Sequence, residues 1–368
     1  MDRALELARL GEAQTSPNPM VGAVLVQDGR TVGEGFHTYA GQRHGEIIAL
    51  HAAGRAARGA TLYLNLEPCC HRGRTGPCTD AILKAGVRRV VAAMKDPNPA
   101  VAGRGFEQLQ AEGVQVEVGV REGEARRLNE AFARWIRTRL PLVTLKSALT
   151  LDGQMAAPTP RKQQHRPAGE RWITSRESRA EVQRLRHAAD AVLTGIGTVL
   201  ADDPLLTDRT GRARRRALLR VIVDSRLRLP QNTKLVKSAD GDVLVFTTES
   251  PDSPRARTLR RAGVEIARVP GRGRPDLRAV AEELGRRQIL SVLLEAGPRL
   301  NWAALEAGLV DKMFLFYSPR ILGGGHAPLV RGGYSALGAA PALRDTTLHR
   351  FGPDFAVEGY LRDVYRNR

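Results

Sequence analysis

The sequence predicts two successive α/β domains, and three observations support this fold class. The chain has 368 residues, which is enough for two domains of ordinary size. Short apolar runs rich in β-branched residues alternate with segments of helical spacing along nearly the whole chain, a pattern typical of sheets covered by helices. Hydrophobic residues make up 42% and charged residues 26% of the chain, as in ordinary globular proteins.

The first domain is expected to span residues 1–141. Its opening residues mix acidic and apolar types without an apolar signal core, which predicts an amphipathic helix in a cytoplasmic protein. The charged segment 122–139 carries apolar residues at helical spacing and predicts one connecting helix that ends before Pro141. Buried strands and intervening helices are expected in this order: strand 21–27, helix 46–57, strand 61–66, helix 79–85 and strand 89–94.

The second domain, residues 142–368, continues the alternation. Strands are expected at 142–148, 191–194, 218–223, 242–247, 289–294 and 312–317, and helices at 175–187, 276–287 and 299–307. The polar, proline-rich stretch 158–168 and the basic stretch 210–216 predict exposed loops. No stretch approaches the ~18–20 apolar residues that cross a bilayer, so no membrane partner is expected.

Cysteine usage and net charge narrow the function. The chain has three cysteines, all between positions 69 and 78, which favours metal or redox chemistry over a disulfide framework. A net charge of +18 fits either nucleic-acid binding or small phosphorylated ligands. Aromatic residues make up only 5%, so the stacking signature of a single-strand binder is missing and no nucleic-acid partner is expected.

The clustered residues predict a zinc site. One imidazole and two thiolates, from His44, Cys69 and Cys78, form a donor set suited to zinc. A catalytic zinc keeps its fourth position for water and lowers the pKa of that water toward ~7. Glu46, two residues after His44, can pass a proton to leaving ammonia without occupying a coordination position. This His-x-Glu and Pro-Cys…Cys arrangement is typical of zinc deaminases.

A structural zinc site is the alternative, because such sites have four protein ligands. Cys70, His71 or His51 could supply the fourth ligand, although we expect Cys70 to lie outside the site and His51 to be a packing or surface residue. Asn18, between two prolines at a strand entrance, offers donors and an acceptor for the edge of a ring; a simple turn is the alternative for this motif. The lone His37 is expected to be structural.

These motifs resemble the bifunctional deaminase–reductase family of bacterial riboflavin biosynthesis. Eight residues separate Cys69 from Cys78, whereas cytidine-type and tRNA-adenosine-type deaminases usually have two there. The matching stretches cover nearly the whole chain: 16–22, 44–46, 66–78, 151–153, 172–175, 190–195, 198–207 and 295–298. The resemblance implies a cytidine-deaminase-like three-layer domain followed by a dihydrofolate-reductase-like domain.

The resemblance also implies two reactions and their residues. The first domain would deaminate a small phosphorylated pyrimidine, a diaminopyrimidinone with a phosphoribosylamino arm, and the second would reduce its ribosyl arm to ribityl with NADPH. Zinc would be held by His44, Cys69 and Cys78, with Glu46 as the proton donor. NADPH would contact Ala148, Trp172, Thr198, Asp202, Ser225, Gly297, Pro298, Arg299, Leu300, Asn301, Trp302 and Ala303. Substrate would contact Asn18, Arg186, Leu206, Arg209 and Glu295.

Residue chemistry supports part of this assignment. Gly297 lies between a predicted strand and helix, where free backbone N–H groups can hold a phosphate. Arg186 and Arg209 offer guanidinium forks to a substrate phosphate. Three positions depart from the family: Gly45 replaces Ala, Cys70 replaces Ser, and Glu170 brings a carboxylate that would repel a phosphate nearby.

The sequence is also compatible with two other functions. One is a zinc deaminase of nucleic-acid bases, such as a tRNA editor, with an added basic domain; the other is a non-enzymatic, zinc-stabilised nucleotide-binding protein in which Glu46 would be dispensable. The sequence leaves the oligomeric state open, a homo-oligomer included.

Overall fold

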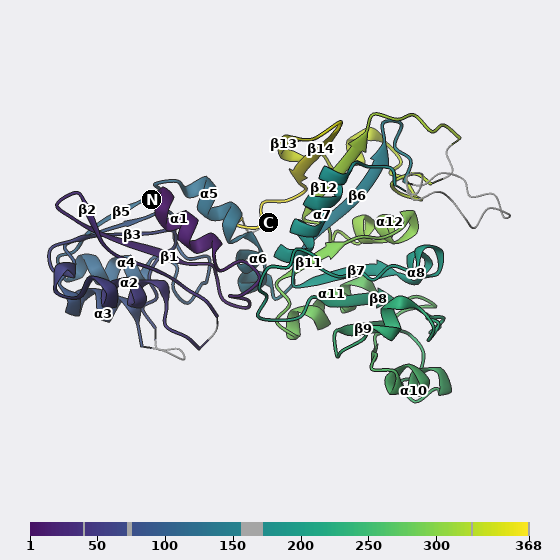
Figure 1. Ribbon diagram of the computed structural model, residues 1–368, viewed down its shortest axis with the longest axis horizontal. Helices are drawn as coiled ribbons and strands as arrows, with labels where there is room; N and C mark the ends of the chain where they lie inside the picture. Colours follow the sequence, from purple (N-terminus) through teal and green to yellow (C-terminus); the bar gives the residue numbers. More distant parts are fainter. Residues whose placement is uncertain (40, 72–75, 156–171, 325–326, 367–368) are drawn as a thin grey trace. The chain divides into compact units, whose positions relative to one another are not determined.

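The computed structural model describes residues 1–39, 41–71, 76–155, 172–324 and 327–366 (Figure 1). The chain forms two compact units, one built on Met1–Arg139 with Ala213–Arg216 and the other on Leu140–Arg212 with Ala217–Arg366. The predicted loop 158–168 and Glu170 lie outside the described residues. No helix within these described ranges is both long and apolar enough to cross a bilayer.

The first unit is a three-layer α/β structure. Its sheet has the order β2-β1-β3-β4-β5, in which β1 pairs antiparallel with β2 and β3, while β3, β4 and β5 are parallel. The strands are β1 (Gly22–Gln27), β2 (Arg30–Phe36), β3 (Thr61–Leu64), β4 (Arg89–Ala92) and β5 (Gln115–Val118). The helices are α1 (Asp2–Arg9), α2 (Gly45–Ala53) with the 3-10 turn η1 (Gly54–Ala57), α3 (Cys78–Ala85), α4 (Arg104–Ala111), α5 (Glu122–Leu128) and α6 (Glu130–Thr138).

Strand alternation explains the layers of this unit. Successive side chains of a strand point to opposite faces of the sheet, so β1 divides its apolar residues between two cores. Leu25 packs with residues of α2, α3 and α4 on one face, whereas Val24 packs with Ala4 and Leu7 of α1 on the other. The helix layers predicted for this domain are therefore present on both faces.

The second unit is built on a nine-stranded sheet of order β10-β9-β8-β7-β11-β6-β12-β14-β13, in which only the pairings of β14 are antiparallel. The strands are β6 (Leu142–Thr150), β7 (Ala191–Gly195), β8 (Leu219–Val223), β9 (Val243–Thr247), β10 (Glu265–Arg268), β11 (Ser291–Leu294), β12 (Lys312–Ser318), β13 (Arg344–Phe351) and β14 (Asp354–Tyr360). The helices are α7 (Arg176–Ala188), α8 (Ile196–Asp202), α9 (Lys234–Lys237), α10 (Pro254–Arg261), α11 (Leu277–Arg286), α12 (Pro298–Glu306) and the 3-10 turn η3 (Leu337–Ala339).

Helices cover both faces of the second sheet. One core joins α11 and α12 to the central strands, and a second core joins α9 and α10 to the opposite face of β7 to β10. A third, smaller core packs Val182 of α7 against Phe314 and Phe316 of β12. Burial on both faces explains why the sequence of these parallel strands is nearly continuously apolar.

The sequence prediction of one helix over 122–139 is wrong, because Asn129 interrupts it between α5 and α6. Asn129 is 2% exposed, and its side chain accepts a hydrogen bond from the Met20 N–H at 2.8 Å and donates one to the Met20 carbonyl at 3.0 Å. The backbone of Asn129 has φ −109° and ψ 18°, outside the helical range, and its side chain is held by the distant Met20 backbone.

Strand β2 was not predicted from the sequence, because it is polar and contains two glycines. Both glycines are required by close packing against α2. A Cβ at Gly33 would lie 2.3 Å from the Ala49 carbonyl oxygen, and one at Gly35 would lie 2.4 Å from the Gly45 carbonyl oxygen. Glycine lowers the strand signal of a sequence, but here it allows the helix backbone to approach the sheet.

Candidate metal centre and reductase site

The edge of the first sheet gathers the candidate deaminase residues. Register pairs Gly22 at the start of β1 with Phe36 at the end of β2, and Ala23 with Leu64 at the end of β3. Strand β4 is parallel to β3, so the segments that follow β2, β3 and β4 all leave the sheet at this edge. Residues from these separate segments therefore meet here.

Three side chains form a compact group at this edge. His44 precedes the first residue of α2, Cys69 follows β3, and Cys78 is the first residue of α3. The His44 Nδ1 atom lies 3.1 Å from the Cys78 sulfur and 3.6 Å from the Cys69 sulfur. The candidate ligand atoms of the three residues all lie within 4.8 Å of one another, so they can surround one ion.

The chemistry of this group fits zinc. The contact between the two cysteine sulfurs, aided by His44, lowers the pKa of the Cys69 thiol and raises that of Cys78, which favours a thiolate at Cys69. Two sulfurs and one imidazole suit zinc, and three protein ligands leave a fourth position for water. Among the described residues, neither Cys70, His71 nor His51 belongs to the group, and His51 is exposed. The structure therefore offers no fourth protein ligand within its described ranges, against the structural-zinc alternative.

Glu46 lies beside this group in the first turn of α2. It is 3% exposed, and within the described residues its Oε2 atom has no hydrogen-bond partner. Burial raises the pKa of this carboxyl group, which favours its holding a proton. A buried carboxyl two positions from a metal ligand is suited to proton transfer.

Asn18 reaches the metal group through His37. The Asn18 Nδ2 atom lies 2.9 Å from His37 Nε2, and His37 Nδ1 lies 3.3 Å from the Arg43 carbonyl oxygen. These partners assign the proton of a neutral imidazole to Nδ1, and burial lowers the pKa of His37 in agreement. The His37 ring, 2% exposed, contacts the His44 ring edge-on at a centroid distance of 5.2 Å. The structural histidine expected from the sequence thus lies against a candidate ligand.

Glu67 anchors a loop at the same edge, and the sequence analysis gave it no role. Its carboxylate accepts hydrogen bonds from the backbone N–H groups of Asp96, Gly103 and Gly105 at 2.8–3.0 Å. It is 3% exposed, so these bonds are shielded from water. A Cβ at Gly105 would lie 2.3 Å from the Pro68 carbonyl oxygen, so this loop packs directly on the cysteine motif.

In the second unit, the predicted cofactor residues follow the carboxyl ends of neighbouring strands. Ala148 lies near the end of β6, Thr198 and Asp202 lie in α8 directly after β7, and Ser225 follows β8. The Thr198 hydroxyl lies 3.9 Å from where a Cβ of Gly297 would be, so α8 and the turn after β11 adjoin each other. In open α/β sheets, ligands bind at the carboxyl ends of strands.

The turn from β11 into α12 places the N-terminus of a helix after the strand. Gly297 caps the helix and Pro298, which has no N–H group, occupies its first turn, while the N–H groups of Leu300 and Asn301 donate to the Gly297 carbonyl at 3.1 Å. The helix has nine residues, and its N-terminal dipole end favours phosphate. The predicted helix start at residue 299 is one residue late, because the proline already adopts helical geometry.

Members of the predicted 297–303 stretch have different surroundings. Arg299 is exposed and Ala303 half-buried. Asn301 is fully buried and donates a hydrogen bond to the Leu329 carbonyl at 2.9 Å, and the Trp302 ring contacts Tyr334 edge-on at 5.0 Å. Trp172, by contrast, is 53% exposed and lies 4.9 Å from the Arg179 guanidinium.

An ionic group with side chains 10–13% exposed lies directly after β11. Glu295 bonds to Arg186 Nε at 2.6 Å, to Arg186 Nη2 at 3.1 Å and to Lys146 Nζ at 3.2 Å. Burial alone would raise the pKa of Glu295, but Lys146 and Arg186 outweigh it and lower the pKa to about 2. The Arg186 fork predicted for a substrate phosphate thus holds this carboxylate. Lys146 was missed, because nothing in the sequence marks it.

The remaining predicted substrate residues belong to the loop after α8. Leu206 is 3% exposed, whereas Arg209 is exposed and its backbone N–H donates to Gln183 Oε1 at 2.9 Å. The Arg186 Nη1 atom donates to the Thr207 carbonyl at 3.1 Å, so the loop reaches the ionic group.

Comparison with known proteins covers both units. Residues 1–94 match the family model of the cytidine and deoxycytidylate deaminase zinc-binding region, and residues 141–357 match the RibD C-terminal domain. The riboflavin biosynthesis protein RibD of Synechocystis sp. is 43% identical over 364 residues, 98% of this chain and 95% of the relative. That of Escherichia coli is 40% identical over 97% of each chain.

Two solved structures of RibD-type proteins match nearly the whole chain. Acinetobacter baumannii RibD matches with a TM-score of 0.84 at 36% identity, over 98% of this chain and 97% of that chain. A diaminohydroxyphosphoribosylaminopyrimidine deaminase/5-amino-6-(5-phosphoribosylamino)uracil reductase from Thermotoga maritima matches with a TM-score of 0.83 at 36% identity, over the same shares.

Proposed function

Because this chain belongs to the RibD family of bifunctional riboflavin-biosynthesis enzymes, we propose that the residues at its two sheet edges carry the family's two reactions. The chain is a deaminase and a reductase, with zinc and NADPH as cofactors. We assign the deaminase to residues 1–141 and the reductase to 142–368. The observation that carries this proposal is the group of His44, Cys69 and Cys78 with buried Glu46 beside it, in one chain with the Glu295 site.

In the deaminase, we assign the three ligands to the zinc and Glu46 to proton transfer. His44, Cys69 and Cys78 would hold the zinc, which as a Lewis acid would activate water for attack on a ring carbon. Glu46 takes up the proton released by the water and passes it to the departing amine, because burial stabilises its protonated form. Asn18, held by His37, orients the ring edge of the substrate.

In the reductase, the residues at the carboxyl ends of β6, β7, β8 and β11 would hold NADPH, which when bound would supply the hydride that reduces the ribosyl arm. The N-terminal end of α12 at Gly297 and the adjoining Thr198 hydroxyl would lie beside its phosphates. Glu295, kept ionised by Lys146 and Arg186, accepts hydrogen bonds from the substrate, and the exposed Arg209 binds its phosphate.

The substrate we propose is the diaminopyrimidinone with a phosphoribosylamino arm, followed by its deaminated product, in keeping with the Thermotoga maritima enzyme's name. We expect no nucleic-acid partner, because a phosphorylated substrate and cofactor explain part of the net charge of +18. A cytoplasmic location and a homo-oligomeric state stay predictions.

The proposal is tested with the full chain, the diaminopyrimidinone phosphate and NADPH. We expect ammonia release with or without NADPH, and NADPH oxidation that begins only after deaminated product has formed. Two measurements check this: ammonia by a coupled assay and NADPH by its absorbance. Absence of ammonia, or NADPH oxidation at full rate without any pyrimidine, would contradict the assignment. Co-purification of tightly bound RNA would favour the nucleic-acid reading.

A further inference from the structure

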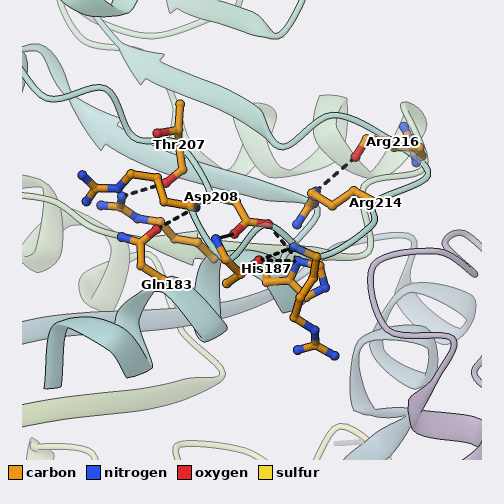
Figure 2. Close-up of polar contacts among 10 residues, drawn as sticks. Gln183, His187, Thr207, Asp208, Arg214 and Arg216 are labelled. Atoms are coloured by element: carbon orange, nitrogen blue, oxygen red, sulfur yellow. Dashed lines mark hydrogen bonds and ion pairs between the residues drawn. The ribbon is translucent and has the colours of Figure 1, made fainter. Parts of the chain in front are cut away.

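One face of α7 holds the loop that carries Leu206 and Arg209. Three of its side chains each bond to a loop residue: Gln183 accepts from the Arg209 N–H at 2.9 Å, Arg186 donates to the Thr207 carbonyl at 3.1 Å, and His187 bonds to Asp208. Figure 2 shows these contacts running from the helix to consecutive positions of the loop. We call them the α7 contacts.

The loop needs such contacts because its backbone is strained. Asp203 and Leu206 have φ angles of +43° and +55°, a left-handed conformation that is unfavourable for residues with a side chain. Outside contacts hold this shape: Asp203 accepts from the Lys234 N–H at 2.8 Å, and Arg220 donates to the Leu205 carbonyl at 3.2 Å. A strained loop persists only where its surroundings over-determine it.

The most buried of the α7 contacts joins His187 to Asp208. Their side chains are 1% and 8% exposed, and His187 Nδ1 lies 2.8 Å from Asp208 Oδ2. The other carboxylate oxygen of Asp208 accepts the Thr210 N–H at 2.9 Å, so the aspartate also fixes the next turn of the loop. A buried hydrogen bond to a charged group has strict geometry, and it therefore fixes the loop along the helix.

From these contacts we infer that His187 and Asp208 are a positioning pair of the reductase: they set the 206–209 loop against α7 so that Leu206 and Arg209 meet the phosphorylated substrate. Neither residue is assigned a direct contact with the reacting atoms. The inference rests on the proposed function, because it takes these two loop residues as substrate contacts. It extends that function to a pair for which the sequence gave no signal.

Two His187 variants separate hydrogen bonding from volume. His187→Phe keeps the ring but removes the Nδ1 donor, whereas His187→Asn keeps an N–H donor near that position. Asp208→Asn removes the charge from the partner. Arg184→Gln, on the exposed side of the same helix, is the matched control.

The readouts are steady-state constants of the full-length enzyme with 5-amino-6-(5-phosphoribosylamino)uracil and NADPH. We expect His187→Phe and Asp208→Asn to raise the KM of the pyrimidine about 10- to 100-fold, the range of a buried hydrogen bond to a charged group. The KM of NADPH should stay within about twofold, since its proposed contacts lie on other segments. His187→Asn should restore most of the loss, and Arg184→Gln should match the parent.

Three results would overturn the inference. They are an unchanged pyrimidine KM in both substitutions, an equal rise in both KM values, or a loss in His187→Asn as large as in His187→Phe. If His187→Phe fails to fold, Asp208→Asn and His187→Asn still test the inference, because the KM of the pyrimidine can be compared with the KM of NADPH in both variants. A parent enzyme that does not reduce this pyrimidine would instead contradict the proposed function.

Discussion

Replacing Glu67 with glutamine should loosen the loop that packs on the cysteine motif. One oxygen of the Glu67 carboxylate accepts from Gly103 and Gly105, and the other accepts from Asp96 and Gly103. Glutamine keeps one acceptor oxygen and turns an NH₂ group toward a buried N–H donor. An unsatisfied buried donor costs about 1–3 kcal/mol, and the lost charge adds to this, so we expect about 2–4 kcal/mol.

Hydrogen exchange of the full-length enzyme measures this cost locally. Opening of loop 95–103 and of the first turn of α4 should become easier by the same free energy, so their amides should exchange about 30- to 1,000-fold faster in Glu67→Gln. Ammonia release should fall, while NADPH oxidation with the deaminated pyrimidine stays near the parent rate, because Glu67 belongs to the other unit. Glu107→Gln removes an exposed carboxylate from the following helix and serves as the control. Exchange in Glu67→Gln that matches this control would refute the reasoning.

Three further predictions concern the two sites. Glu46→Gln should abolish ammonia release while zinc analysis still finds about one ion per chain; unaltered turnover would contradict the proton-transfer role. Cys78→Ser should lose zinc, whereas Cys70→Ser should retain it, since only Cys78 lies in the ligand group; equal zinc loss in both would place Cys70 in the site. The Glu295 carboxyl has its pKa lowered to about 2 from 4.5, so its ionic contacts stabilise the fold above about pH 4.5 by about 3 kcal/mol. In urea unfolding, the free energy of unfolding should decrease as pH falls from 4.5 toward 2. Glu295→Gln should have a lower free energy of unfolding at pH 7, and the decrease that comes from Glu295 should be missing in this variant.

The metal centre could be predicted because each of its residues lies next to the start of a helix or the end of a strand. His44 precedes a helix, Cys69 follows a strand and Cys78 begins another helix, so short motifs fix their types and spacing. Because β1 pairs antiparallel with both β2 and β3, these two strands end at the same edge of the sheet. Glu67 lies within the same stretch 66–78, but its role could not be predicted, because its partners are backbone N–H groups, which leave no trace in residue types.

The ionic group of the reductase could not be predicted for a different reason. Arg186 is 109 positions from Glu295 in the sequence, and Lys146 is 149 positions from it. In so arginine-rich a chain, nothing distinguishes Arg186 from a solvated surface charge, yet its side chain is 12% exposed. Only the sheet order, with β11 between β7 and β6, brings these segments together.

The cofactor segments and the substrate loop of the reductase depend on different features of the sequence. Ser225 and Gly297 follow strands, so any chain that forms this sheet places them at the same edge. His187 precedes a strand, and its place in the site depends on one hydrogen bond to a loop with two left-handed residues. The sheet alone therefore suffices to bring the cofactor segments together, whereas the substrate loop requires specific side chains from α7. Substitutions of that helix face should consequently change pyrimidine binding before they change NADPH binding.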